Sequence, residues 1–288
     1  MPKAYISALS GGLGNQMFQY AVGRSLSLRH GVPLLLDTRM VEQDALRAYA
    51  LSGFRIQADI AAPSQLPPKL GRIGRRLRWL PRWMTRRAYV FEKGFAFDRS
   101  MLAIRPPAHL SGNWQSEKYF ANSSDVIRSD FELAQPLTPE RQAVADAIAG
   151  INAVSVHVRR GDYLSNPVAN AYHGTCEPAW YALAKQKIEQ TVRNPSYVVF
   201  SDDPDWARAN LHEFVSAKFV APLQDGSDEQ DLHLMARCRH HIIANSSFSW
   251  WGAWLNPRAD KVVIAPAQWF RAATHDTSDL IPSGWQRL

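Results

Sequence analysis

The chain has 288 residues, a hydrophobic fraction of 46% and a net charge of +7, values that suit a soluble globular protein with one large domain or two smaller ones. Its two cysteines, Cys176 and Cys238, exclude a disulfide framework and a cysteine-based metal cluster. No run of residues is long and apolar enough to span a bilayer, and the N-terminus lacks the apolar core of a signal peptide, so we expect a cytoplasmic protein.

The chain opens with a β-α-β pattern. Residues 4–9 predict a strand, residues 15–30 predict a helix, and residues 33–36 predict a buried strand that ends at Asp37. This order favours a parallel sheet, which binds its ligands beyond the carboxyl ends of its strands.

The turn Ser10-Gly11-Gly12-Leu13-Gly14 joins the first strand to the first helix. Its glycines allow close approach of a ligand, and the helix start offers unpaired N–H groups. The turn is not a P-loop, and it fits a dinucleotide fingerprint imperfectly because Met17 occupies the place of the third glycine. Asp37 lies near the expected position of a ribose-binding acid, so an NAD-dependent oxidoreductase remains an alternative. A tight turn without a ligand is another.

A basic insertion at about residues 60–91 stands out within the irregular stretch 38–107. Between Pro63 and Phe91 there is no acidic residue, while Lys69–Arg87 interleaves Lys and Arg with Trp and Leu. This segment fits a solvated helical face and an anionic membrane surface equally well. Nucleic acid is a weaker third partner, because nothing else in the chain resembles a reader of bases.

The second half of the chain alternates regularly between strands and helices. A short strand at residues 108–111 and a helix at residues 139–149 precede it. Strands are predicted at residues 154–158, 197–200, 218–220, 241–244 and 262–265, and helices at residues 178–192, 204–211, 228–238 and 248–255. We predict an α/β fold of two Rossmann-like halves that face each other across a cleft, with residues 1–150 and 151–288 as the two domains.

The strand at residues 154–158 delivers several functional side chains to its carboxyl end. His157, Arg159, Arg160 and Asp162 come together there. A guanidinium group matches a phosphate or diphosphate and keeps its charge. Because neighbouring strand residues point to opposite faces, Arg159 lies on the side of His157, and Arg160 turns away into structural pairing. The pattern predicts a site for a phosphorylated donor that uses arginine where another enzyme uses a metal.

Asp202 and Asp203 follow the next strand of this half. Paired carboxylates there hold a divalent metal in some proteins. In the alternative, one binds a base or ribose and the other caps the helix that begins at Pro204. We favour the alternative, because Arg159 already supplies positive charge.

A hydroxyl-rich turn, Asn245-Ser246-Ser247, precedes the helix that Phe248 begins. Its N–H groups and hydroxyls suit a diphosphate, and simple helix capping is the alternative. Trp250, Trp251 and Trp254 recur at helical spacing, which favours core packing over sugar stacking.

Three segments together resemble the bacterial α-1,2-fucosyltransferases of glycosyltransferase family 11. The matching stretches are residues 11–21, 157–163 and 245–251, so the resemblance spans most of the chain. It implies a GT-B-type fold and inverting transfer of L-fucose from GDP-β-L-fucose to the 2-hydroxyl of a terminal galactose, without an essential metal.

The resemblance also implies roles for individual residues. Arg159 would bind the β-phosphate and stabilise the leaving GDP, Asp162 is the candidate general base, and Asn15 would orient the acceptor or the fucose. The implied donor-binding residues are His157, Arg159, Asp202, Asn245, Ser246, Ser247, Phe248, Gly12 and Gly14.

Expected partners are GDP-fucose and a galactose-terminated glycan, but no nucleic acid. A lipid-linked acceptor, as in O-antigen synthesis, would be compatible with peripheral contact between Lys69–Arg87 and the inner face of the membrane. A glycan-binding module without turnover is the main alternative function. GDP binding or donor hydrolysis would exclude it.

Overall fold

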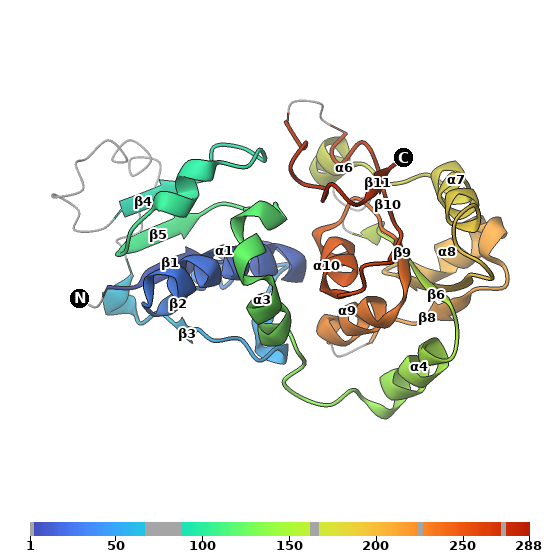
Figure 1. Cartoon of the computed structure of the whole chain (residues 1–288), viewed down its shortest axis with the longest axis horizontal. Coiled ribbons are helices and arrows are strands. Elements are labelled where there is room, and N and C mark those ends of the chain that lie inside the picture. Colours follow the sequence, from blue (N-terminus) through green and yellow to red (C-terminus); the bar gives the residue numbers. More distant parts are fainter. Residues whose placement is uncertain (1–2, 67–87, 162–166, 224–226, 272–274) are drawn as a thin grey trace. The chain divides into compact units, whose positions relative to one another are not determined.

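A computed structural model of the chain describes residues 3–66, 88–161, 167–223, 227–271 and 275–288. The chain divides into two compact units, Met1–Ala134 with Ser278–Leu280, and Gln135–Thr277 with Ile281–Leu288. Figure 1 labels most of the helices and strands of both units.

The division between the units falls earlier in the chain than the expected boundary near Gly150. The reason is helix α4 (Pro139–Ala149), which packs against α9 (Asp228–Arg237) of the second unit. Ala145 and Ile148 of α4 are buried in one cluster with α9 side chains, and Arg141 forms an ion pair with Asp231. Helix α4 is therefore part of the second unit.

The first unit contains a parallel sheet in the order β3-β2-β1-β5-β4. Helix α1 (Leu13–His30) packs along β1 and ends at Gly31, whose φ of +61° suits glycine. A Cβ atom on Gly23 would stand 2.7 Å from Leu34 Cδ1, so this glycine permits close packing of the helix on the sheet. The strands are β1 (Tyr5–Ala8), β2 (Leu34–Asp37), β3 (Asp59–Ile60), β4 (Ala88–Phe91) and β5 (Ala108–Ser111).

Short helical segments complete the described part of the first unit. They are the 3-10 helices at Leu51–Gly53, Pro63–Gln65, Arg99–Ala103, Glu117–Tyr119 and Ala121–Ser123, and helix α3 (Ser124–Asp130).

The second unit contains a parallel sheet in the order β11-β10-β9-β6-β7-β8. Its strands are β6 (Ala153–Val158), β7 (Ser196–Ser201), β8 (Lys218–Val220), β9 (His240–Ile242), β10 (Val263–Ala265) and β11 (Gln286–Arg287). Among the described residues, its remaining helices are α6 (Pro167–His173), α7 (Pro178–Glu189), α8 (Pro204–Asn210), the 3-10 helix His212–Phe214 and α10 (Ser247–Leu255).

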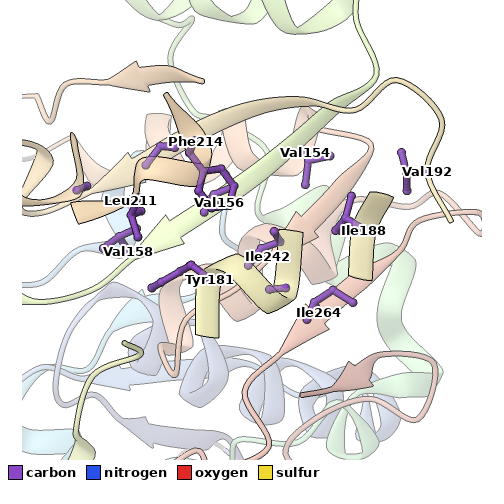
Figure 2. Close-up of a cluster of buried hydrophobic side chains, with 13 residues drawn as sticks. Val154, Val156, Val158, Tyr181, Ile188, Val192, Leu211, Phe214, Ile242 and Ile264 are labelled. Carbon is purple, nitrogen blue, oxygen red and sulfur yellow. The ribbon is translucent and has the colours of Figure 1, made fainter. Parts of the chain in front are cut away.

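The two faces of strand β6 carry different side chains. Val154, Val156 and Val158 lie in a buried cluster with side chains from α7, β9 and β10 (Figure 2). The alternate residues Ser155 and His157 point to the opposite face of the sheet. The alternation of β6 thus anchors the strand on one side and presents a buried histidine on the other.

Each sheet has a switch point, where consecutive connections leave a strand in opposite directions. In the second unit the chain steps from β6 to β7 and β8, and then returns to place β9 on the other side of β6. In the first unit β2 and β3 lie on one side of β1, and β5 lies on the other. Ligands of open α/β sheets bind beyond the carboxyl ends of the two strands at such a point.

Two residues of helix α7 test this description of the core. Ile188 is fully buried in the cluster beneath β6, whereas Leu183 is 53% exposed. Replacement of Ile188 by alanine should lower the free energy of unfolding by about 2–5 kcal/mol, because it removes buried methyl groups and leaves a cavity. The matched change Leu183→Ala should alter it by less than about 0.5 kcal/mol. Urea unfolding measures both, and equal effects would contradict the assignment of the core.

Candidate active site at the switch point of the second sheet

Arg159 lies just beyond the carboxyl end of β6 and is held by a carboxylate from the neighbouring strand. Its Nη1 lies 3.0 Å from Oδ2 of Asp202, and each of the two side chains is 24% exposed. Asp202 Oδ1 also accepts a hydrogen bond of 2.9 Å from the backbone N–H of Arg160. A Cβ atom on Gly161 would stand 2.8 Å from Asp202 Oδ2, so this glycine lets the carboxylate approach the loop closely. Asp202, expected to contact the nucleotide, thus fixes the direction of Arg159.

Arg160 turns away from this pair, as the alternation of β6 predicted. Its guanidinium carbon lies 3.5 Å from the ring centroid of Trp206 in α8, and its Nε lies 3.6 Å from Asp203 Oδ2. Asp203 accepts a 3.1 Å hydrogen bond from the N–H of Trp206 and thereby caps α8. The prediction that one aspartate of the pair is a helix cap is confirmed.

His157 is buried beside Arg159 on the face of the sheet that α10 covers. Its ring centroid lies 5.6 Å from that of Phe248, at an interplanar angle of 45°. Burial and the positive charge of Arg159 lower the pKa of His157 to about 3, so the imidazole is neutral near pH 7. Its buried Nδ1 has no hydrogen-bond partner among the described residues. The ring therefore offers a neutral nitrogen, and no charge, to this site.

Asn245 performs a structural task at the loop that follows β9. Its Nδ2 donates to the carbonyls of His173, Gly174 and Trp269 at 3.0–3.2 Å. These bonds give the amide nitrogen of Asn245 a structural role, and donor binding by Asn245 stays a prediction. The sequence could not reveal the structural role, since the carbonyls come from distant parts of the chain.

Ser246 and Ser247 stand at the start of α10, at the switch point between β6 and β9. Ser246 is the N-cap residue, but its hydroxyl does not cap the helix, and its own N–H donates to the carbonyl of Ala244 at 2.8 Å. The simple capping interpretation is therefore wrong for the side chain. The first N–H groups of an α-helix have no partner within the helix, which leaves this end suited to an anion.

The tryptophans of α10 pack in the core, as their spacing predicted. Trp250 and Trp251 are fully buried, and Trp254 is nearly so.

The glycine turn of the first unit is ordered by amide side chains. Gly12 is the N-cap residue of α1 and accepts the N–H groups of Asn15 and Gln16, while Gly14 is buried within the first turn. The Gln16 amide donates to the carbonyls of Gly11 and Ala48 and accepts from the N–H of Ala50. Gln115, which the sequence did not single out, donates to Asn15 Oδ1 at 2.8 Å.

Asp37 is engaged by Arg39 and His109 rather than presented to a ribose. It pairs with Arg39 at 2.7 Å and with His109 Nε2 at 3.0 Å. Burial alone would raise the pKa of Asp37. The hydrogen bonds from Arg39 and His109 nevertheless hold this pKa well below its ordinary range. This pairing weakens the oxidoreductase interpretation.

Several sequence predictions lie beyond what the structure describes. Asp162 and the segment Lys69–Arg87 fall outside the described residues. Within the described ranges, no three or more His, Cys, Asp or Glu side chains gather as a metal-binding group, and metal independence stays a prediction. Of the helices in those ranges, none combines the length and apolar character that crossing a bilayer requires.

The buried histidine gives a testable dependence of stability on pH. The unfolded state binds a proton at His157 below about pH 6.5, whereas the folded state resists protonation down to about pH 3. The free energy of unfolding should therefore fall as the pH drops through this window, by at most about 1.4 kcal/mol per pH unit from this group. His240 and His241, whose pKa values burial also lowers, act in the same direction.

His157→Gln isolates the contribution of the one ring. Urea unfolding at pH 7, 6, 5 and 4 should show a shallower loss of stability in this variant than in the parent chain. An identical slope in the two proteins would contradict a neutral, buried His157.

Comparison with known proteins identifies the family. The sequence profile of glycosyl transferase family 11 matches residues 3–288. An α-1,2-colitosyltransferase from Escherichia coli is 32% identical over 290 residues, covering 98% of each chain. The O-antigen biosynthesis glycosyltransferase WbnK from Escherichia coli is 30% identical over 305 residues, covering 98% of this chain and 99% of the relative. The bovine galactoside α-(1,2)-fucosyltransferase 1 is 27% identical over 85% of this chain and 64% of its own length.

A solved structure shares the fold. The NodZ α-1,6-fucosyltransferase soaked with GDP-fucose superposes with a TM-score of 0.53 at 17% identity, covering 93% of this chain and 96% of that one. Together with the two parallel-sheet units, this similarity confirms the predicted GT-B-type fold. The profile match over almost the whole sequence shows that the chain belongs to glycosyltransferase family 11.

Proposed function

We propose that this chain is an inverting fucosyltransferase that moves L-fucose from GDP-β-L-fucose to the 2-hydroxyl of a terminal galactose. The observation that carries the proposal is the Arg159–Asp202 ion pair at the ends of β6 and β7, beside the switch point of the second sheet. Membership of glycosyltransferase family 11 supports transfer of a sugar. The names of the E. coli and bovine relatives support the α-1,2 linkage, and that of the bovine relative supports the galactoside acceptor.

The chemistry of the leaving group explains the need for Arg159. Cleavage of the bond between fucose and the diphosphate places negative charge on the β-phosphate of GDP. A guanidinium already fixed by Asp202 stabilises this charge without reorganising during the reaction. Ser246, Ser247 and Phe248 at the start of α10 would hold the diphosphate, and neutral His157 would line the pocket.

Inversion requires the acceptor hydroxyl to attack the sugar from the face opposite the diphosphate. Asp162 is the proposed general base, because it follows Arg159 closely in the sequence. Asn15 is proposed to orient the acceptor or the fucose. Gly12 and Gly14 shape the turn that carries Asn15. No metal is needed in this scheme, since arginine carries the compensating charge.

Transfer of colitose is a second candidate function. The E. coli α-1,2-colitosyltransferase matches this chain over nearly its full length. Colitose is fucose without its 3-hydroxyl, so the same diphosphate site would serve either nucleotide sugar. The two donors differ by one hydroxyl group. A site that hydrogen-bonds this hydroxyl discriminates strongly between the donors, whereas an apolar site discriminates weakly. In either case we propose an O-antigen type of glycan as acceptor, with peripheral membrane contact through Lys69–Arg87.

A donor and acceptor survey tests the reaction. The purified chain is incubated with GDP-fucose or GDP-colitose and a panel of galactose-terminated oligosaccharides, with and without EDTA, and the product linkage is determined by NMR. We expect an α-1,2-linked product from GDP-fucose and equal rates in EDTA. Product from GDP-colitose alone would favour the second candidate. Absence of transfer from both donors, or another linkage, would overturn the proposal.

Arg159→Ala tests the role of the ion pair. Loss of a preorganised cation at the developing charge should lower kcat by about 100- to 1,000-fold. Asp202→Asn should also lower kcat, because it leaves the guanidinium without its charged partner. The matched control is Arg258→Ala, which removes an exposed arginine of the same unit that is ion-paired with Asp260.

Steady-state kinetics and thermal unfolding are measured for the three variants. The control should keep the parent rate. A loss of less than about tenfold in folded Arg159→Ala, which corresponds to about 1.4 kcal/mol, would refute the assigned role.

A further inference from the structure

The first unit has its own switch point, between β1 and β5, and two loops follow these strands. One is the glycine turn that begins α1, and the other is residues 112–115. Since β1 and β5 are parallel neighbours, both loops leave the same edge of the sheet. This edge is a second place where an open α/β sheet binds ligands.

The loop after β5 is held in an unusual backbone conformation. Trp114 has a φ of +56°, a region that side-chain-bearing residues rarely adopt. The Glu92 carboxylate accepts the N–H groups of Asn113 at 2.6 Å and Trp114 at 2.9 Å, and Gly112 leaves space for it. The Trp114 ring is buried and packs edge-on against Tyr119, with ring centroids 5.6 Å apart. Such strain persists only where the surroundings enforce it, and it concentrates at functional sites.

Gln115 is the residue that this loop places. The N–H of Ser116 donates to the carbonyl of Trp114 at 2.8 Å, which makes a tight turn around Gln115. The side chain belongs to a residue only 7% exposed, and its Nε2 donates to Asn15 Oδ1 at 2.8 Å. Its Oε1 is buried and has no hydrogen-bond partner within the described ranges. A buried acceptor without a donor is rare in folded proteins and indicates a missing partner.

The bond from Gln115 also fixes what Asn15 offers. Because Oδ1 of Asn15 is used as an acceptor, the amide cannot turn over without losing that bond. Its Nδ2 lies beside Gly11, 2.6 Å from where a Cβ atom on that glycine would stand. The two amides thus combine an N–H donor on Asn15 with a carbonyl acceptor on Gln115. A hydroxyl group is both donor and acceptor, so one sugar hydroxyl or two neighbouring ones satisfy this pair.

We propose that Gln115 is a positioning and specificity-determining residue, and that it forms with Asn15 an amide pair that binds hydroxyl groups of the acceptor sugar. This assignment rests on the proposed transfer reaction. It goes beyond that reaction because it names the residues of the first unit that bind the uncharged acceptor sugar. Glu92, Gly112 and Trp114 are then the supports that hold Gln115 in place.

The test separates the acceptor from the donor. Gln115→Ala removes the amide, Gln115→Glu keeps its size but replaces the donor to Asn15 with a second oxygen, and Asn15→Ala removes the partner. The matched control is Gln57→Ala, an exposed amide of the same unit that donates to the carbonyl of Arg55. For each chain we measure KM for acceptor and donor, hydrolysis of GDP-fucose without acceptor, and thermal unfolding.

All three site variants should raise the acceptor KM by about tenfold or more. In the two Gln115 variants, donor KM and donor hydrolysis should stay within about twofold. The double variant Asn15→Ala/Gln115→Ala should be no worse than the single ones, because the two residues act as a unit. If Gln115→Ala does not fold, Gln115→Glu carries the same test. An unchanged acceptor KM in folded variants would overturn the proposal, as would an equal loss of donor hydrolysis in a Gln115 variant.

A binding measurement keeps this inference separate from the reaction itself. If the parent chain transfers neither fucose nor colitose, the proposed function fails, and saturation-transfer NMR with methyl β-galactoside tests the amide pair directly. Binding to the parent chain that is lost in Gln115→Ala and kept in Gln57→Ala supports the pair. No binding to the parent chain, or equal binding to Gln115→Ala, overturns it.

Discussion

An arginine that is paired with a carboxylate at the end of a buried strand keeps its direction whether or not a ligand is present, and Arg159 is in this situation. Asp202 binds its guanidinium and, through the N–H of Arg160, the loop that carries it. The apolar face of β6 fixes the strand itself. Burial of this core therefore sets the position of the charge, and the ion pair sets its orientation. A cation arranged in this way is suited to a pyrophosphate, because its solvation and geometry need not change when negative charge develops.

The same construction principle operates twice in the chain. Each unit has a parallel sheet with one switch point, and each switch point carries polar side chains that other residues hold in place. In the second unit these side chains are charged or aromatic and suit a nucleotide. In the first unit the Asn15–Gln115 pair is neutral and suits a carbohydrate. The difference in charge between the two switch points follows from the residues at the strand ends.

Much of the fold could be predicted from the sequence, because long periodic elements carry strong local signals. The strand at β6 and the proline-led helices α4, α7 and α8 all appear where the pattern placed them. Helix α6, which lies between β6 and α7, was not predicted. The stretch 38–107 resisted prediction, since β3 and β4 have only two and four residues and show no period. The unit boundary was placed too late because the sequence of α4 does not show which unit the helix belongs to. Its packing on α9 assigns it to the second unit.

A residue of the candidate site could be predicted where its role depends on its own strand. It could not be predicted where its role depends on contacts with residues far away in the sequence. The alternation of β6 alone gives the opposite directions of Arg159 and Arg160. The pairing of Arg159 with Asp202 joins two strands, and the bond from Gln115 to Asn15 spans 100 residues. Such contacts leave no local pattern. Motif comparison therefore marked Asn15 and passed over Gln115, although both amides belong to one contact.

Asn245 shows where this architecture is most vulnerable. Three carbonyl groups from the segments around His173 and Trp269 converge on one amide. Loss of that amide would release both segments together, so damage would spread well beyond the volume of a single side chain. The side chain that joins these segments carries no charge, and the groups that its amide nitrogen holds are backbone carbonyls.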